Sequence, residues 1–308
     1  MLKFYAMKKL KFVFVSFLLL GLLVSCEEYE DYVKDYDYTA TYFGTQKPLR
    51  TIVAYETMEF EVGVVLAGMR EDDGSHEVYF EVDTNLLNTI PEAAGFLPLP
   101  EEYYSLGDES NFNIKKDHMR TVKVTLNREA FTADPAAISN TYALPLRITE
   151  ATVDSILNNG TDTETIDSKD ISILVVKYIS PYSGYYYSKG TQYTLDSEGT
   201  PVDTIVYYNK DLSQNAVKEF VTESLNVIST DKFGSNIAGD MELTVNSDDS
   251  FDLSSSDVVI NSYDGTYLKD ENTFYLDVNL TKSGITYLVK DTLILRQAPE
   301  LDLRFEEW

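Results

Sequence analysis

The sequence predicts an all-β protein, and three observations support this fold class. Apolar and polar residues alternate with a period of two in many short segments, for example Met58, Phe60, Val62, Val64 and Leu66. Such alternation is typical of strands with one buried and one solvated face. Turn-forming pairs such as Asp73-Gly74 separate the segments. Helical periodicity is rare, and we expect only single helical turns, at 85–89 and 153–157.

The first 25 residues (1–25) have the pattern of an export signal. A basic segment precedes an uncharged apolar run, Phe12 to Val24, which is shorter than the roughly 20 residues needed to span a bilayer. The run ends in Leu23-Val24-Ser25-Cys26, which resembles the lipobox of bacterial lipoproteins. The resemblance implies that Cys26 becomes a lipid-carrying N-terminus. The alternative is an ordinary secreted protein with a chance cysteine.

Lipidation at Cys26 would fix where the protein works. Two or three acyl chains on one residue exceed the two signals that stable anchoring requires. We therefore expect a lipid-anchored protein of the outer membrane, facing the cell exterior. Cys26 is the single cysteine of the chain, so no disulfide can form within it and the fold depends on core burial.

The chain is strongly acidic, with 25 basic and 51 acidic residues. Loss of the four lysines of the signal, which has no acid, takes the formal net charge from −26 to −30. Such a field repels nucleic acid and anionic lipid headgroups. Neutral ligands, which include many glycans, are not repelled.

Three segments follow the signal. Residues 26–38 form an acidic tether, in which Glu27 and Glu28 resemble the surface-export signal of lipoproteins from glycan-harvesting bacteria. Any disordered linker can be acidic, which is the alternative. Residues 39–178 contain about seven strand patterns, which suggests an immunoglobulin-like β-sandwich.

A break near Ser180-Pro181 begins the last segment, residues 179–308. Its strands are longer and are joined by tight turns, which suits an antiparallel β-barrel of lipocalin type or a second sandwich. Residues 215–229 fit a helix or a strand. The spacing of Val217, Phe220, Val221 and Leu225 favours the helix slightly.

Two known families resemble these segments. Tyr42–Ile52, Phe60–Gly68, Val82–Leu87, Leu99–Tyr104 and Tyr142–Ile148 are similar, in order, to domain of unknown function 1735. The stretch from Gly184–Tyr187 to Thr292–Arg296 resembles domain of unknown function 4361, which is often fused behind it. Such two-domain lipoproteins occur in polysaccharide-utilisation loci. The resemblance implies surface display and glycan capture, and it supplies no catalytic or binding motif.

Enzymatic patterns are not found in the sequence. The two histidines, His76 and His118, lie in different segments, and no serine elbow, His-Glu-x-x-His pair or phosphate loop occurs. Paired carboxylates could serve a glycosidase, but 51 acids make any pair uninformative. We predict no catalytic residue, cofactor or metal. The oxygen donors Asn246, Asp248, Asp249 and Asp252 lack EF-hand spacing and fit a hairpin turn better than a calcium site.

Tyrosine is the feature that the fold class does not explain, with 23 tyrosines against one tryptophan. A phenol offers a flat apolar face to a sugar ring and a hydroxyl to its polar edge. On a strand, Tyr185 and Tyr187 share a face and Tyr186 points oppositely, so at least one of them packs inward. Trp308 could cap the barrel or dangle. The candidate ligand-binding residues are Tyr182, Tyr185, Tyr186, Tyr187 and Tyr193.

These observations predict a non-enzymatic surface lipoprotein that binds a glycan for uptake by a polysaccharide-utilisation system. Its partners would be the glycan, the membrane through the lipid anchor and an outer-membrane transporter complex, but not nucleic acid. Two alternatives stand beside this prediction. One is a ligand-free structural accessory of the transporter complex, and the other is an atypical glycoside hydrolase.

Overall fold

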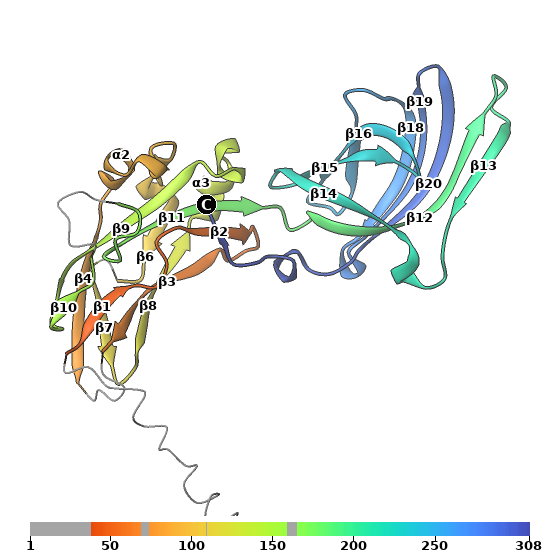
Figure 1. Cartoon of the computed structure of the whole chain (residues 1–308). Coiled ribbons are helices and arrows are strands. Elements are labelled where there is room, and N and C mark those ends of the chain that lie inside the picture. Colours follow the sequence, from red (N-terminus) through yellow and green to blue (C-terminus); the bar gives the residue numbers. More distant parts are fainter. Residues whose placement is uncertain (1–37, 69–73, 109, 159–164) are drawn as a thin grey trace, which may run out of the picture.

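A computed structural model describes residues 38–68, 74–108, 110–158 and 165–308. The described chain is all-β, as predicted, and forms two lobes that lie end to end (Figure 1). The first lobe is a β-sandwich, and the second is one strongly curved antiparallel sheet. The export signal, Cys26 and nearly all of the tether lie outside the described residues. No helix among the described residues is long and apolar enough to cross a membrane.

The sandwich consists of two sheets of five and seven strands in the described chain. The first has the order β10-β1-β3-β8-β6, with bounds β10(Ser155–Ile156), β1(Ala40–Phe43), β3(Glu59–Ala67), β8(Met119–Leu126) and β6(Tyr104–Leu106). The second has the order β21-β2-β11-β9-β4-β7, with bounds β21(Glu306–Glu307), β2(Pro48–Val53), β11(Ile171–Ile179), β9(Tyr142–Ala151), β4(Ser75–Val82) and β7(Asn111–Lys115). A short strand, β5(Leu97–Pro98), pairs with β9.

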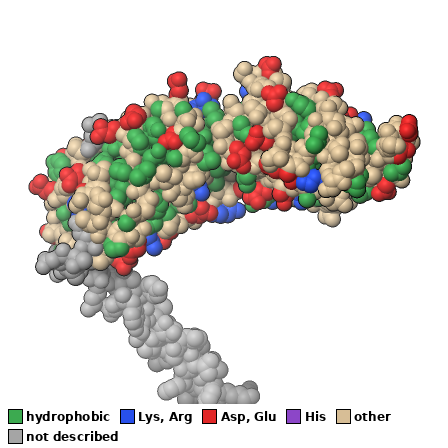
Figure 2. Space-filling model, turned by 90° about the horizontal axis from the view of Figure 1, so that it is seen from above, with side chains coloured by type: hydrophobic (Ala, Val, Ile, Leu, Met, Phe, Trp, Pro, Cys, Tyr) green, Lys and Arg blue, Asp and Glu red, His purple; other side chains and the backbone are tan. Residues whose placement is uncertain are grey.

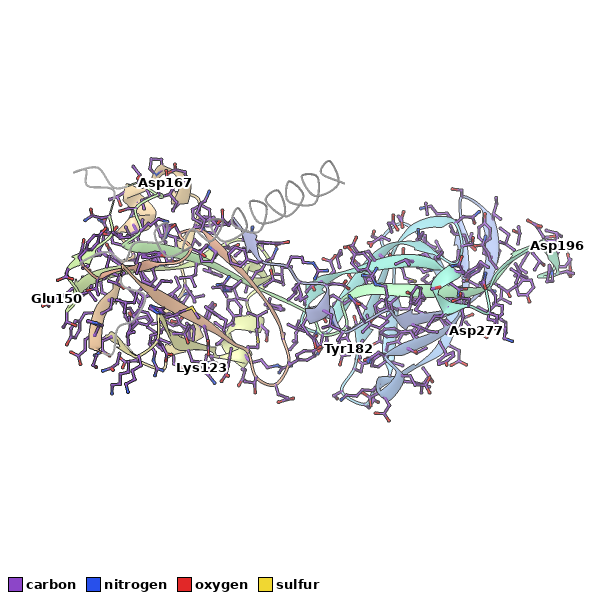
Figure 3. The ribbon with its side chains drawn as sticks, turned by 60° about the horizontal axis from the view of Figure 1, so that its bottom comes forward. Lys123, Glu150, Asp167, Tyr182, Asp196 and Asp277 are labelled. Carbon is purple, nitrogen blue, oxygen red and sulfur yellow. The ribbon has the colours of Figure 1, made fainter. Side chains whose placement is uncertain are left out.

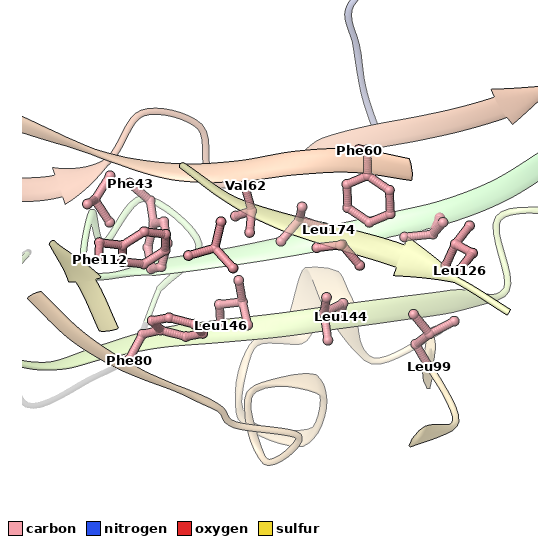
Figure 4. Packing of buried hydrophobic residues seen from close by; sticks show 14 of the residues in the cluster. Phe43, Phe60, Val62, Phe80, Leu99, Phe112, Leu126, Leu144, Leu146 and Leu174 are labelled. Carbon is pink, nitrogen blue, oxygen red and sulfur yellow. The ribbon is translucent and has the colours of Figure 1, made fainter. Parts of the chain in front are cut away.

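The alternating residues of these strands fill the core between the sheets. Val62 of β3 faces Leu144 and Leu146 of β9 (Figure 4), and Val64 belongs to the same buried cluster. Each fully buried side chain of this kind contributes about 1.5–3 kcal/mol. The period of two that predicted the strands therefore also identified the core.

Helices are short, as expected. The turn predicted at 85–89 is α2(Leu86–Thr89), but the turn predicted at 153–157 is wrong, because β10 pairs there with β1 through Ala40 and Ser155. α3(Arg128–Thr132) begins after Asn127, whose side chain accepts a hydrogen bond from Ala130 N. The remaining single turns are η2(Pro91–Ala93), η3(Glu101–Tyr103), η4(Pro135–Ile138), η5(Leu212–Gln214), η6(Lys269–Glu271) and η7(Pro299–Leu301).

The second lobe is a nearly closed barrel with the strand order β17-β16-β15-β14-β12-β20-β19-β18. Phe251 and Tyr263, from the two terminal strands, stack with ring centroids 6.3 Å apart, and the Tyr263 hydroxyl donates to Asp252. β13 pairs with the C-terminal half of β12, from Gly190 to Leu195. The bounds are β12(Gly184–Leu195), β13(Pro201–Tyr207), β14(Ala216–Ser224), β15(Val227–Phe233), β16(Ile237–Val245), β17(Phe251–Ser254), β18(Val259–Leu268), β19(Thr273–Lys282) and β20(Ile285–Leu295).

The helix favoured for residues 215–229 is wrong, because β14 and β15 occupy this segment. Lys218 and Phe220 alternate inward, whereas Val217 and Val221, which gave the helical spacing, are exposed. Two valines on a solvated face therefore imitated the apolar stripe of a helix.

The barrel interior contains one buried ion pair. Lys218 Nζ donates to Asp291 Oδ2 at 2.6 Å, and the side chains are 1% and 3% exposed. Ser188 Oγ donates to Asp291 Oδ1 at 3.0 Å. Burial and the neighbouring Asp291 raise the pKa of Tyr207. Its hydroxyl reaches this cluster over Gly190, where a Cβ would lie 2.8 Å from the hydroxyl oxygen.

The last residues of the chain return from the barrel to the sandwich (Figure 1, dark blue). β21 pairs with β2, and Trp308 Nε1 donates to Ile173 O at 2.6 Å. The Trp308 ring lies 4.8 Å from the Phe96 ring, edge to face. Trp308 thus packs on the sandwich and neither caps the barrel nor dangles. We call residues 299–308 the returning tail, and they join the lobe predicted as residues 39–178.

Candidate functional site

Tyr186 belongs to the barrel core and not to a surface. It is fully buried, its hydroxyl donates to Tyr182 O at 2.6 Å, and its ring packs against Phe220 and Phe274. Burial raises its pKa well above the ordinary tyrosine value. The structure thus assigns the inward-pointing role, which the alternation required of at least one tyrosine, to Tyr186.

Tyr182 precedes β12 and is not part of its outer face. It lies at the junction of the two lobes (Figure 3), and its half-buried ring contacts Tyr267 edge to face at 5.5 Å. Burial raises the pKa of Tyr267 to about 12. Tyr182 therefore supports the packing of the junction.

Tyr185, Tyr187 and Tyr193 point outward from β12, and each is half-buried. Both the ring and the hydroxyl of Tyr185 already contact other side chains. The Arg296 guanidinium lies 4.7 Å from the Tyr185 ring centroid, and a hydrogen bond to Glu219 raises the Tyr185 pKa. Of the five predicted residues, the structure thus leaves Tyr187 and Tyr193 as the outward phenols without such an engagement.

The strand register brings two further tyrosines to the same outer face. Lys189 of β12 is opposite Thr292 of β20, and Thr292 is opposite Tyr275 of β19. On the other side, the pairing of Gly190 with Tyr207 places Tyr208 next to Lys189, whose Nζ lies 5.7 Å from the Tyr208 ring centroid. Tyr208 is 61% exposed and Tyr275 is 41% exposed. We call Tyr187, Tyr193, Tyr208 and Tyr275 the tyrosine face.

Hydrogen-bonding side chains lie between these rings. Thr191 and Thr292 present hydroxyls outward, and Lys290 Nζ bonds Asp277 Oδ2 at 3.0 Å with both side chains about half exposed. That hydrogen bond raises the Lys290 pKa. β12 and β19 are two strand spacings apart, roughly 10 Å. The tyrosine face thus combines flat apolar rings with donors and acceptors on one sheet surface.

The five candidate residues from the sequence did not include Tyr208 and Tyr275. The alternation of Phe274, Tyr275 and Leu276 indicates that Tyr275 points away from the core. It does not indicate that β19 lies two strands from β12, because that order comes from long-range pairing.

Two hollows of the described surface are large enough to hold a ligand or a peptide segment. One, of about 690 Å³, lies between β14 and β15 and is analysed below. The other, of about 750 Å³, opens at the sandwich edge between Val82 and β6, with Leu99 in its lining. Acidic side chains are scattered over both lobes on the face that Figure 2 displays. They form no patch that singles out one lobe.

The segment 246–250 forms the hairpin turn that the sequence favoured there. Asn246 Nδ2 donates to Ser250 Oγ and to Asp252 Oδ2, and Ser250 N donates to Asp248 Oδ1. Asp249 adopts a positive φ of 64° at the turn. Within the described ranges, no group of three His, Cys, Asp or Glu side chains could hold a metal ion.

Comparisons with known proteins support the fold. A family model described as an N-terminal domain matches residues 32–155. A crystal structure of a protein of unknown function from Bacteroides ovatus is 24% identical, with a TM-score of 0.72 over 88% of this chain and 99% of that chain. The two proteins share a fold, and no function is known for the relative. No curated protein matches the chain.

Two further solved structures from Bacteroides ovatus are more distant. A multidomain protein that includes domain of unknown function 1735 is 13% identical, with a TM-score of 0.43 over 88% of this chain and 100% of that chain. A protein of unknown function is also 13% identical, with a TM-score of 0.42 over 86% of this chain and 95% of that chain.

Proposed function

We propose that this protein is a non-enzymatic surface lipoprotein that binds a glycan through the tyrosine face. The observation that carries the proposal is the gathering of four outward tyrosines, from β12, β19 and the end of β13, around hydroxyl and charged side chains. Buried tyrosine would be explained by strand propensity and packing. Neither strand propensity nor core packing requires several exposed tyrosines on a single face.

The chemistry of this face suits a neutral sugar chain. Phenol rings pack against the apolar faces of sugar rings, and the threonine hydroxyls and the Lys290–Asp277 pair can exchange hydrogen bonds with ring hydroxyls. The charges of Lys290 and Asp277 balance each other, and Lys189 adds one positive charge beside the Tyr208 ring. Because the whole chain carries a formal charge of −26, a polyanion would be repelled at long range.

A surface location fits this function. The lipobox and acidic tether predict an anchor at Cys26, and a tether of about twelve residues reaches roughly 40 Å when extended. The resemblance to two-domain lipoproteins of polysaccharide-utilisation loci supports the same location and an uptake system as partner. The protein would then hold glycans at the outer membrane for that system.

A glycan array probed with residues 27–308 tests the function. We expect binding to a small set of related neutral glycans, and no binding to single- or double-stranded nucleic acid. An array on which no plant, host or microbial glycan is bound above background would contradict the proposal.

A further inference from the structure

The hollow between β14 and β15 is a gap in the hydrogen-bonded wall of the barrel. The two strands pair only through Val221–Ser229, Thr222–Ile228 and Ser224–Val227. The part of β14 that precedes Val221 has no strand partner on the side that faces β15. The hollow of about 690 Å³ opens there, between β14 and β15. We call this gap the β14 notch. It is lined by residues 217–219 and 221 of β14, 229–232 of β15, 238–240 of β16 and Asp257.

The strand register shows which backbone groups face the β14 notch. Arg296 N donates to Tyr185 O, so the Tyr185 main chain bonds β20 and the main chain of Tyr186 bonds β14. Tyr186 pairs with Lys218, so Lys218 and Phe220 direct their main-chain groups at β12. Val217 and Glu219 therefore direct their N–H and C=O groups into the notch. Neither Val217 nor Glu219 is among the residues of β14 that pair with β15.

A strand edge of this kind is normally protected, as β13 shows. The free edge of β13 begins with Pro201, contains an irregularity at Val202, and has its Thr204 N–H bonded to Asp203 Oδ1 at 2.9 Å. Proline, bulges and local capping are the devices that blunt exposed edges. The edge of β14 in the notch has none of them. Its outward side chains include Val217 and Val221, which are 40% and 48% exposed.

The charges around the β14 notch select the occupant. Lys218 is neutralised by Asp291, and Asp257 is neutralised by Lys282 at 2.6 Å. The remaining charged residues of the lining are three acids, Glu219, Asp231 and Asp240, and one base, Lys232. The β14 notch therefore has a net negative charge. The chain's own tether, with six acids and one lysine in residues 27–38, is repelled by such a site.

We propose that the β14 notch binds an extended segment of a partner protein that carries basic side chains, and that this segment adds as a strand to β14. Main-chain hydrogen bonds to Val217 and Glu219 supply affinity, as in other cases of β-strand addition. Apolar side chains of the segment pack on Val217 and Val221, and its basic side chains lie near Glu219 and Asp231. The β14 notch borders the tyrosine face, since Tyr187 is opposite Val217, and its occupant is tested with a peptide and not with a glycan.

Synthetic peptides test the proposal on the whole soluble protein. The probe is a seven-residue peptide with capped ends, which consists of valine, threonine and two lysines. One control peptide has glutamate in place of lysine, and another keeps the lysines but has N-methyl groups on alternate backbone nitrogens. We expect the lysine peptide to bind and to slow hydrogen exchange at the Val217 and Glu219 amides. Both controls should bind at least about ten-fold more weakly, because main-chain and charged contacts both contribute.

Matched variants locate the site. Val217→Pro removes one N–H that faces the notch and leaves the pairing with β12, so it should weaken the lysine peptide about ten-fold or more, whereas Val217→Ala should bind nearly as wild type. Tyr275→Ala should not affect peptide binding. The proposal is overturned if the lysine peptide does not bind, if the N-methylated peptide binds equally well, or if protection appears on β13 instead. The peptide comparison on wild type decides the matter even if Val217→Pro fails to fold.

Discussion

At the scale of single residues, the buried pair Lys218–Asp291 makes the clearest stability prediction. Both side chains are almost completely removed from solvent, and Ser188 also donates to the carboxylate. Lys218→Met would leave the Asp291 charge buried without its partner, which typically costs about 3–5 kcal/mol. Urea denaturation of the variant measures this cost.

A double variant separates the ion pair from simple packing. Lys218→Met combined with Asp291→Leu removes both charges and should recover much of the lost stability, since apolar replacements of buried pairs are often neutral. A double variant that is as unstable as the sum of the two single variants would show that the charges do not interact.

Asp134 predicts the acid dependence of the sandwich. Hydrogen bonds from the Tyr142 hydroxyl at 2.5 Å, Ala136 N and the Tyr103 hydroxyl lower the pKa of Asp134. The Asp134 pKa in the folded state thus lies below the unfolded value of about 3.9, so the ionised carboxylate stabilises the fold at pH values above about 3.9. This stability is lost as the pH falls from there towards the folded-state pKa. Asp134→Asn should flatten this part of the acid limb in thermal melts. Asp231→Asn, which changes an exposed aspartate on β15, should retain the wild-type limb.

At the scale of elements, most strands could be predicted and their neighbours could not. The alternation that predicted a strand at 58–66 matches β3, and the same alternation of apolar and polar residues runs through β8 and β19. It also assigned opposite faces to Tyr185 and Tyr186, which the structure confirms. The helix favoured for 215–229 failed because exposed valines at 217 and 221 imitate an apolar stripe. Strand order depends on contacts between distant residues, so neither the tyrosine face nor the β14 notch could be found from local patterns.

The returning tail alters what is expected of the lobes as separate pieces. Residues 39–178 have their own core, and a fragment of these residues should show β-type circular dichroism and a cooperative melt. The fragment lacks β21 and Trp308, which cover β2 and the cluster near Phe96. Its melting temperature should therefore rise when a peptide of residues 299–308 is added.

Trp308→Ala in the intact chain tests the same contact. The ring is only partly buried, so the loss should be roughly 1–3 kcal/mol, below the 3–5 kcal/mol of a fully buried aromatic residue. A melt unchanged by both Trp308→Ala and deletion of residues 299–308 would show that the returning tail does not stabilise the sandwich.

At the scale of the whole molecule, the lobes are joined by more than one connection. Ser180 N donates to Thr222 Oγ1 and Ser180 Oγ donates to Leu225 O at the first crossing. The Tyr55 hydroxyl donates to Glu300 Oε2 at 2.7 Å at the returning tail. Two chain crossings with hydrogen bonds on each favour a fixed orientation of the barrel on the sandwich, so that the tyrosine face is held at a defined distance from the sandwich.

Anchoring itself is tested at Cys26. Cys26→Ala removes the thiol that the lipobox prediction modifies, so the variant should lose its acyl chains and leave the detergent phase on partitioning. Ser25→Ala keeps a small residue before the cysteine and should remain membrane-bound. Detergent partitioning equal to wild type in Cys26→Ala would exclude the lipid anchor.

The central claim is that the tyrosine face binds the glycan. Calorimetric titration of the variant Tyr187→Ala/Tyr275→Ala, with a glycan selected on the array, tests it most directly. Each aromatic contact removed from a binding surface can cost about 1–2 kcal/mol or more, so we expect at least a ten-fold loss of affinity with a nearly unchanged melt. Tyr79→Ala, on the sandwich, is the matched control and should bind as wild type. Wild-type affinity in the double variant, with a normal melt, would contradict the account and place the glycan elsewhere on the molecule.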